Sequence, residues 1–418
     1  MKKLCVNLCR LLLAVTFILS GFVKAVDPLG TQYKINDYLE AMGLGGLPDW
    51  SMLAASVLLS AVEFCLGIFL LFAIRRRLTS RLILLMMAVM TPLTLWLAIA
   101  NPIHDCGCFG DAVVLTNWQT FWKNIVLLGC AVVVAMWPKE MFRFVSESNQ
   151  WIVINYSALF ILAISAWSLY YLPTFDFRPY HVGTNLREQW QRTMDGEDLP
   201  YADFFIEQHS DGEDITEAVL ADTSYVFLLI SPHLEQADDS RLDLINELYE
   251  YARDHDYGFY CLTASTQQNI ERWHDITGAE YPFCQTDEIT LKTVIRSNPG
   301  LLLLKDGTII RKWSHNDLPV IDETATSKPL QQQPFGQLPG NSVARKITLI
   351  LLWFVLPLAL LTLADRTWMW TKWLRRKSRK SQNAQNAQDA QDAHQAQDAH
   401  QAQDAHQAQD AHQAHQAH

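Results

Sequence analysis

The sequence predicts an α-helical membrane bundle that carries an external α/β domain, and three observations support this fold class. Apolar, nearly uncharged runs of about twenty residues recur along the 418-residue chain, and an α-helix of that length crosses the hydrocarbon core of a bilayer. Lysine and arginine flank these runs unevenly, as they do in multi-pass membrane proteins. Between the last two runs, residues 173–340 alternate strand-like and helix-like patterns.

Six runs are long enough to span a bilayer. The first four lie within residues 1–140 and predict a four-helix membrane domain, while the fifth, at 151–172, and the sixth, at 347–364, enclose the α/β segment. Lys2 and Lys3 open the first run as in a signal peptide, but no small-residue cleavage site follows, so we expect it to remain as an anchor. The predicted spans are Cys5 to Val23, Ser51 to Ile74, Leu82 to Ala100, Trp118 to Trp137, Trp151 to Leu172 and Ile347 to Ala364.

The basic residues predict which side of the membrane each loop faces. Threading six spans places four clusters of lysine and arginine on one side, which the positive-inside rule makes cytoplasmic. We therefore expect an inner-membrane protein with both chain ends in the cytoplasm and residues 173–340 in the periplasm. The clusters are Lys2, Lys3 and Arg10; Arg75, Arg76, Arg77 and Arg81; Lys139 and Arg143; and Arg366, Lys372, Arg375, Arg376, Lys377, Arg379 and Lys380.

The charge balance restricts the partners. The formal net charge of −11 is concentrated in the external segment, where acidic residues outnumber basic ones roughly two to one. An acidic surface repels a phosphate backbone, so the composition argues against nucleic acid. The expected partners are the lipid bilayer and a periplasmic client protein.

The external loop "NPIHDCGCFGDAV" holds Cys106 and Cys108, separated by one glycine. Disulfides persist in the periplasm, and a Cys-x-Cys disulfide closes a small strained ring that is easily reduced. Gly107 and Gly110 allow the tight backbone that this loop needs. The leading interpretation is a reversible dithiol in which Cys106 and Cys108 are the reactive residues.

Two other interpretations of this loop remain open. His104, Asp105 and Asp111 offer further ligands for zinc or copper beside the thiolates, although the spacing is too cramped for all of them to bind one ion. The loop is also compatible with a purely structural tight turn. We predict no metal site.

Three stretches within residues 1–140 resemble the DoxX-like membrane proteins, and among them the branch of the methylamine-utilisation protein MauE. They are "RLLLAVTFILSGFVKAVDP", "AVEFCLGIFLL" and "DCGCFGD", of which CGCFG is the most specific part. The resemblance implies a four-helix membrane domain that acts in periplasmic disulfide formation or in the maturation of a periplasmic partner. Because one fold serves many functions, this role is an expectation at the level of the family.

Glu63 lies mid-membrane in the second span, where a carboxylate is costly and is expected to face the bundle interior. A structural hydrogen bond to a span and a proton-relay role are both compatible with that position. A membrane quinone is a candidate acceptor of electrons from the cysteine pair, but no residue identifies a quinone site, and no other cofactor is evident.

The external segment reads as strand, helix, strand and helix, followed by a hairpin that turns at Asp306-Gly307. This order resembles the thioredoxin-like fold, in which a proline, usually cis, precedes the hairpin. "SNPGLLLLKDG" places Pro299 there, so we predict a cis bond between Asn298 and Pro299. Redox-active members carry Cys-x-x-Cys at the start of the first helix, whereas this chain has Pro-His-Leu-Glu at 232–235.

We predict no functional role for two further cysteines or for the C-terminal tail. Cys261 and Cys284 fall near neighbouring strands and are expected to form either a structural pair or two inert thiols. Residues 381–418 repeat Gln-Ala-Gln-Asp-Ala-His, have nothing to bury and are expected to be disordered.

The leading functional hypothesis is an accessory in periplasmic thiol–disulfide exchange that acts through the CGCFG loop, while the soluble domain docks the client. Whether the chain is an enzyme stays open at this point. The alternative is a non-enzymatic membrane scaffold whose thioredoxin-like domain binds an envelope partner.

Overall fold

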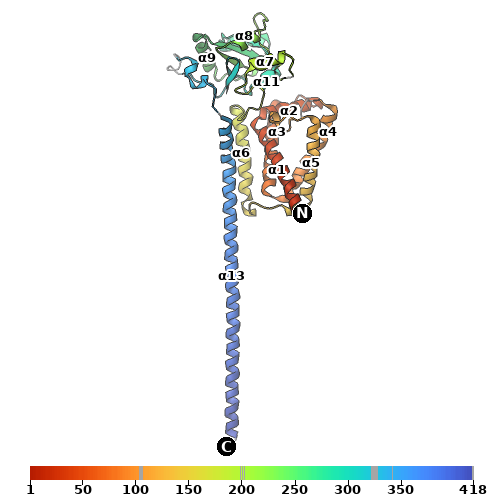
Figure 1. Cartoon of the computed structure of the whole chain (residues 1–418), viewed down its shortest axis with the longest axis vertical. Coiled ribbons are helices and arrows are strands. Elements are labelled where there is room, and N and C mark those ends of the chain that lie inside the picture. Colours follow the sequence, from red (N-terminus) through yellow and green to blue (C-terminus); the bar gives the residue numbers. More distant parts are fainter. Residues whose placement is uncertain are drawn as a thin grey trace.

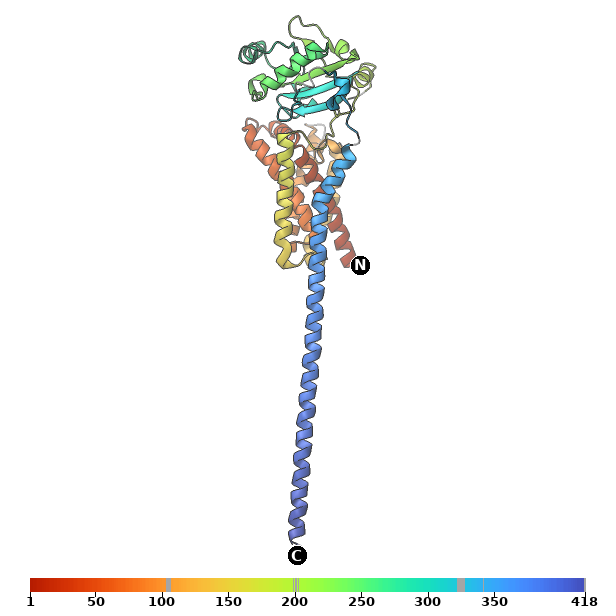
Figure 2. The ribbon, with the colours of Figure 1, turned by 90° about the vertical axis from the view of Figure 1, so that its left-hand side faces the viewer.

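The computed structural model describes residues 1–102, 107–197, 199, 201, 203–321, 328–340 and 342–416. Within them, six helices are long and apolar enough to cross a membrane, which matches the six predicted spans. They stand side by side with the α/β domain at one end, and a view turned by 90° shows the same arrangement (Figures 1 and 2). The six are α1 (Lys2–Val26), α3 (Asp49–Phe72), α4 (Arg76–Ala100), α5 (Asn117–Met136), α6 (Gln150–Tyr170) and α13 (Ser342–Gln416).

The spanning helices form an open arc. α5 packs on α4 and on α1, α1 packs on α3, and α3 packs on α6, whereas α3 and α4 touch each other far less. A Cβ atom added at Gly21 of α1 would lie 2.4 Å from the backbone nitrogen of Phe64 in α3, so a glycine is needed where these two helices cross. This close crossing brings the polar residues of α1 against α3.

The basic clusters meet at the end of the bundle that lies opposite the α/β domain. Arg76 at the start of α4 donates a 2.8 Å hydrogen bond to the carbonyl of Lys139 after α5. Lys2 lies over the ring of Trp137, and Arg366 of α13 donates to the carbonyl of Phe144. We call this the basic end of the bundle and the opposite one the domain end.

The α/β domain is built on a mixed sheet with the strand order β1-β4-β3-β2-β5-β6. Strands β2, β3 and β4 are parallel, and the hairpin β5-β6 runs antiparallel beside β2. The Asn298–Pro299 peptide bond before β5 is cis, as predicted. The domain is therefore thioredoxin-like. The strands are β1 (Glu207–Gln208), β2 (Tyr225–Ile230), β3 (Gly258–Thr263), β4 (Phe283–Gln285), β5 (Gly300–Lys305) and β6 (Thr308–Ser314).

Several shorter helices complete the chain. α2 (Pro28–Ala41) lies at the domain end, and it begins at Pro28 because Asp27 caps it and a proline suits the first turn. The α-helices of the domain are α7 (Leu186–Met194), α8 (Thr216–Ala221), α9 (Leu242–Asp254), α10 (Gln267–Thr277) and α11 (Glu288–Val294). The 3₁₀ turns are η1 (Gly110–Ala112), η2 (Pro138–Glu140), η3 (Glu147–Asn149), η4 (Leu234–Gln236), η5 (Leu330–Gln332) and η6 (Pro334–Gly336).

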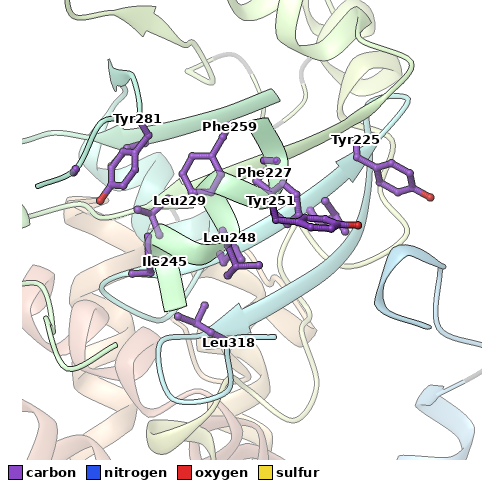
Figure 3. Packing of buried hydrophobic residues seen from close by; sticks show 14 of the residues in the cluster. Tyr225, Phe227, Leu229, Ile245, Leu248, Tyr251, Phe259, Tyr281 and Leu318 are labelled. Atoms are coloured by element: carbon purple, nitrogen blue, oxygen red, sulfur yellow. The ribbon is translucent and has the colours of Figure 1, made fainter. Parts of the chain in front are cut away.

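The sheet has a hydrophobic core on each face. Phe227 and Leu229 of β2 pack with Ile245 and Leu248 of α9 on one face (Figure 3), and the alternate side chains of β2 join the other core. β2 lies in the middle of the sheet, between β3 and β5. Both of its faces are buried, which explains why the run "SYVFLLIS" is apolar without interruption.

Cys261 and Cys284 do not pair. Both are free thiols, and they belong to the two different cores on opposite faces of the sheet. Burial raises the pKa of the Cys261 thiol well above its usual range and that of Cys284 to about 12. Of the two expectations for these residues, inert thiols is the one that the structure supports.

The tail differs from the expected disorder. α13 continues as one helix through the repeat to Gln416, far beyond the basic end of the bundle (Figure 1). Alanine and glutamine favour helix, and extending a helix that the membrane span has already nucleated requires no new nucleus. The polar composition of the tail does not reveal that a preceding helix can extend into it.

Candidate functional site

A cavity of about 860 Å³ lies between the domain end of the bundle and the α/β domain. Its lower wall reaches membrane depth, where Leu59 and Glu63 of α3 face Met90 and Leu93 of α4. α2 and residues around Cys108 form its sides, and residues of the α/β domain form its roof. We call it the domain-end cavity, and its volume is within the range of about 300–1,000 Å³ typical of small-molecule sites.

A buried ion pair lies at the bottom of this cavity. Lys24 Nζ is 2.6 Å from Glu63 Oε2, and the two side chains are only 7% and 6% exposed. Ser20 stands one helical turn before Lys24 on the same face of α1, and its hydroxyl accepts a 2.9 Å hydrogen bond from the ammonium. Glu63 is thus directed inward, as predicted, and it pairs both with the hydroxyl of Ser20 and with the ammonium of Lys24, a charge that is not among its predicted partners.

The same network supports the cysteine loop. Ser20 Oγ lies 2.7 Å from Glu63 Oε2 and 2.7 Å from the carbonyl oxygen of Cys108, and its single proton serves one of them at a time. Cys108 is half-buried and lines the domain-end cavity beside Lys24 and Glu63. A second cavity of about 40 Å³ below it is lined by the same three residues and by α4 and α5. The Cys108 segment therefore sits directly on the buried ion pair.

The described part of the loop has the tight backbone that its glycines predict. Gly107 and Gly110 adopt φ angles of 62° and 50°, which glycine tolerates better than other residues. Cys106 lies outside the described residues, together with His104 and Asp105, so its pairing with Cys108 stays a hypothesis. No group of three metal-binding side chains occurs among the described residues, and the metal alternative, which needs His104 and Cys106, also stays untested.

Arg296 joins the α/β domain to the bundle. Its Nε is 3.1 Å from each carboxylate oxygen of Asp27, its Nη2 is 3.9 Å from Asp111, and its guanidinium stacks 5.2 Å from the ring centre of Tyr33. Asp27 also accepts a 2.9 Å hydrogen bond from the backbone of Gly30 and so caps α2. Because Asp111 follows Cys108 by three residues, Arg296 contacts both the start of α2 and the segment just after the cysteine.

Burial and charge act against each other at this contact. Burial raises the pKa of the Asp111 carboxyl, and the nearby Arg296 works in the opposite direction. Burial lowers the pKa of Arg296, but Asp27, Tyr33 and Asp111 more than offset this, so the net shift is upward and the guanidinium stays charged.

The position where redox-active thioredoxin-like proteins carry cysteines holds a histidine with two carboxylates. His233 Nε2 is 2.9 Å from Glu288 Oε1, and its Nδ1 is 3.4 Å from Glu235. Its backbone carbonyl accepts a 2.8 Å hydrogen bond from Asn298, the residue before the cis proline Pro299. His233 therefore has fixed side-chain and backbone partners.

Sequence reasoning missed two contacts of this site. Lys24 lies in one of the stretches that carry the family resemblance, but it is not predicted to be the partner of Glu63. Arg296 is not singled out at all. A signal existed for Lys24, since a lone lysine and a lone glutamate in adjacent apolar helices predict a pair. Nothing local marks Arg296, because its partner Asp27 is 269 residues away in the chain.

Comparison with known proteins identifies the membrane part. Residues 2–137 match the family model of the methylamine utilisation protein MauE, so the first four spanning helices form a MauE domain. None of the curated proteins compared matches this chain.

Several solved structures match part of the chain. A putative protein disulfide isomerase from Bacteroides thetaiotaomicron is 16% identical, with 28% of this chain and 76% of that chain covered and a TM-score of 0.23. StoA from Bacillus subtilis is 16% identical over 26% of this chain and 84% of that one, with a TM-score of 0.22. Similarity this low carries no argument about activity, and the thioredoxin-like assignment rests on the sheet order and the cis proline.

Proposed function

We propose that this multi-pass membrane protein with a MauE domain exchanges disulfides with periplasmic client proteins through Cys106 and Cys108. A client thiolate attacks the Cys106–Cys108 disulfide, and a mixed disulfide forms as one of the pair leaves as a thiolate. The second client thiolate then displaces the other cysteine. The client gains a disulfide, and the pair is left reduced by the same two electrons.

The observation that carries this proposal is the position of Cys108. It lines a cavity that opens under the α/β domain, and the buried Lys24 lines the same cavity. The carbonyl of Cys108 is also held close to Lys24 and Glu63 through the hydroxyl of Ser20, so the cysteine is fixed at the wall of this cavity. Ionisable residues at membrane depth are costly and usually functional, and this pair lies directly beneath the Cys108 segment.

The orientation is part of the proposal. The basic end of the bundle carries the lysine and arginine clusters, so the positive-inside rule places it in the cytoplasm of an inner-membrane protein. The domain end, with Cys108 and the α/β domain, then faces the periplasm, where disulfides persist.

Repeated turnover requires the pair to be reoxidised. A lipid-soluble quinone is the proposed acceptor, because it takes up two electrons and two protons and is dissolved in the same membrane. The net reaction is then oxidation of a client dithiol to a disulfide and reduction of the quinone to a hydroquinone.

The test is capture of the mixed disulfide. The purified full chain in lipid nanodiscs is mixed with a peptide that carries one reduced cysteine, so that the peptide cannot release itself from a mixed disulfide, and the mixture is quenched with acid and alkylated. Of the variants Cys106→Ala and Cys108→Ala, first oxidised with a small disulfide, one is expected to accumulate a reducible complex with the peptide, because its remaining cysteine has no neighbour to release the client. Cys65→Ala, which removes a half-buried thiol from α3, should behave like the unmodified chain. If neither loop variant traps the peptide, the exchange proposal fails.

One observation favours the alternative of a non-enzymatic scaffold. The usual redox position of the α/β domain holds His233, Glu235 and Glu288 in place of a thiol pair. The trapping experiment separates the two functions, since a scaffold binds its partner without a covalent intermediate.

A further inference from the structure

The domain-end cavity separates α3 from α4 at the lipid-facing edge of the arc. The two helices are joined at the basic end by a turn at residues 73–75, and on the domain side the cavity walls include Leu59 of α3 and Leu93 of α4. Next to these lining residues, Leu58 and Val89 are 65% and 61% exposed, as expected of side chains on the lipid side of a spanning helix. An apolar molecule dissolved in the bilayer therefore meets the cavity at the gap in the arc.

Polar groups are confined to the inner side of this membrane-depth part. An ammonium group has three N–H donors, and Lys24 uses two of them for Glu63 and Ser20. Within the described part of the chain, its third donor remains for an oxygen atom in the cavity. The outer side is lined by Leu59, Met90 and Leu93. The wall of the cavity toward the lipid is thus apolar, and the wall formed by α1 offers a hydrogen-bond donor.

We infer that the membrane-depth part of the domain-end cavity binds the head group of a lipid-soluble quinone. One ring carbonyl accepts a hydrogen bond from Lys24, the ring lies against Met90 and Leu93, and the apolar tail leaves between α3 and α4. A water-soluble oxidant fits this site less well, because it would have to leave water for an apolar wall. The electron donor in this inference, the cysteine pair, is taken from the proposed function. Binding of the quinone does not depend on the proposed function.

The site also brings the acceptor close to its donor. Cys108 lines the same cavity as Lys24 and Leu93. In the transfer, the S–H bonds of Cys106 and Cys108 break, the S–S bond forms, and two electrons and two protons pass to the two quinone oxygens. The dithiol becomes a disulfide and the quinone a hydroquinone, so atoms and electrons balance.

The experiment measures binding without any client. The full chain in quinone-free nanodiscs is titrated with a short-tailed ubiquinone, and quenching of intrinsic tryptophan fluorescence reports the dissociation constant. Leu93→Phe narrows the membrane-depth part of the cavity, whereas Val89→Phe adds at least as much volume at an exposed position of α4. We expect Leu93→Phe to weaken binding at least tenfold and Val89→Phe to change it less than twofold.

Three outcomes would overturn the inference. They are quenching no stronger than in nanodiscs that hold an unrelated membrane protein, equal losses in both variants, and displacement of the quinone by phospholipid as readily as by a second quinone. Because no thiol reaction enters the readout, binding can succeed while client trapping fails, and the reverse also holds. The fate of the quinone site is therefore separable from that of the proposed function.

Discussion

Replacing Lys24 with methionine is expected to destabilise the membrane bundle more than any other single change at the site. The substitution leaves the carboxyl of Glu63, which is 6% exposed and at membrane depth, without its counter-charge. Removing one partner of a buried ion pair typically costs about 3–5 kcal/mol, because the remaining charge stays desolvated. The measurement is the free energy of unfolding in mixed detergent micelles, followed by tryptophan fluorescence.

The double variant Lys24→Met with Glu63→Leu is the matched control. It removes both charges, so no uncompensated carboxylate remains, and we expect it to regain most of the stability that Lys24→Met loses. Both variants should nevertheless weaken quinone binding, since both lack the ammonium donor. If the double variant is as unstable as the sum of its two single variants, the ion pair is not what makes Lys24 important.

Replacing Arg296 with methionine is expected to release the α/β domain from the bundle. The guanidinium is 7% exposed and contacts Asp27, Asp111 and Tyr33. Without it, Asp27 and Asp111 on the bundle side lose their counter-charge, and the α/β domain loses the attraction that holds it to them. Amide hydrogen exchange in α2 and η1 should accelerate at least tenfold, while β2 and β3 in the domain core keep their protection.

An exposed arginine of the same domain provides the control for this change. Arg253 lies 3.8 Å from Glu280, with side chains 56% and 73% exposed, and exposed pairs contribute little. Arg253→Met should leave exchange in α2 unchanged. If Arg296→Met behaves in the same way, the α/β domain is held by other contacts and Arg296 is not its anchor.

The sequence predicts the elements of this molecule well because each carries a local signal. Six apolar runs predict the spanning helices, and the strand at 225–230, the helix at 242–254 and the hairpin around Asp306 follow from their periodicity. The cis bond before Pro299 follows from the resemblance of the strand and helix order to the thioredoxin-like fold, in which a proline precedes the hairpin. Each of these signals is contained within a short stretch of sequence.

The candidate site is only partly predictable for the opposite reason. Cys108 and Glu63 can be singled out from their residue types. Ser20, which contacts both of them, cannot, because its role depends on the crossing of α1 and α3 at Gly21. The contact between Arg296 and Asp27 depends on how two separately folded parts meet. The helical tail shows a further limit, since a helix that begins in a membrane span can extend into a polar repeat.

Differential alkylation in intact spheroplasts tests the central claim most directly. A membrane-impermeant maleimide is applied before and after a mild reductant, and mass spectrometry of the loop peptide reports Cys106 and Cys108 separately from the other cysteines. The account predicts that both are protected before reduction and that both are labelled together afterwards, because they form an outward-facing disulfide. Labelling of both without the reductant at every redox poise, or labelling of both only after the membrane is permeabilised, would contradict it.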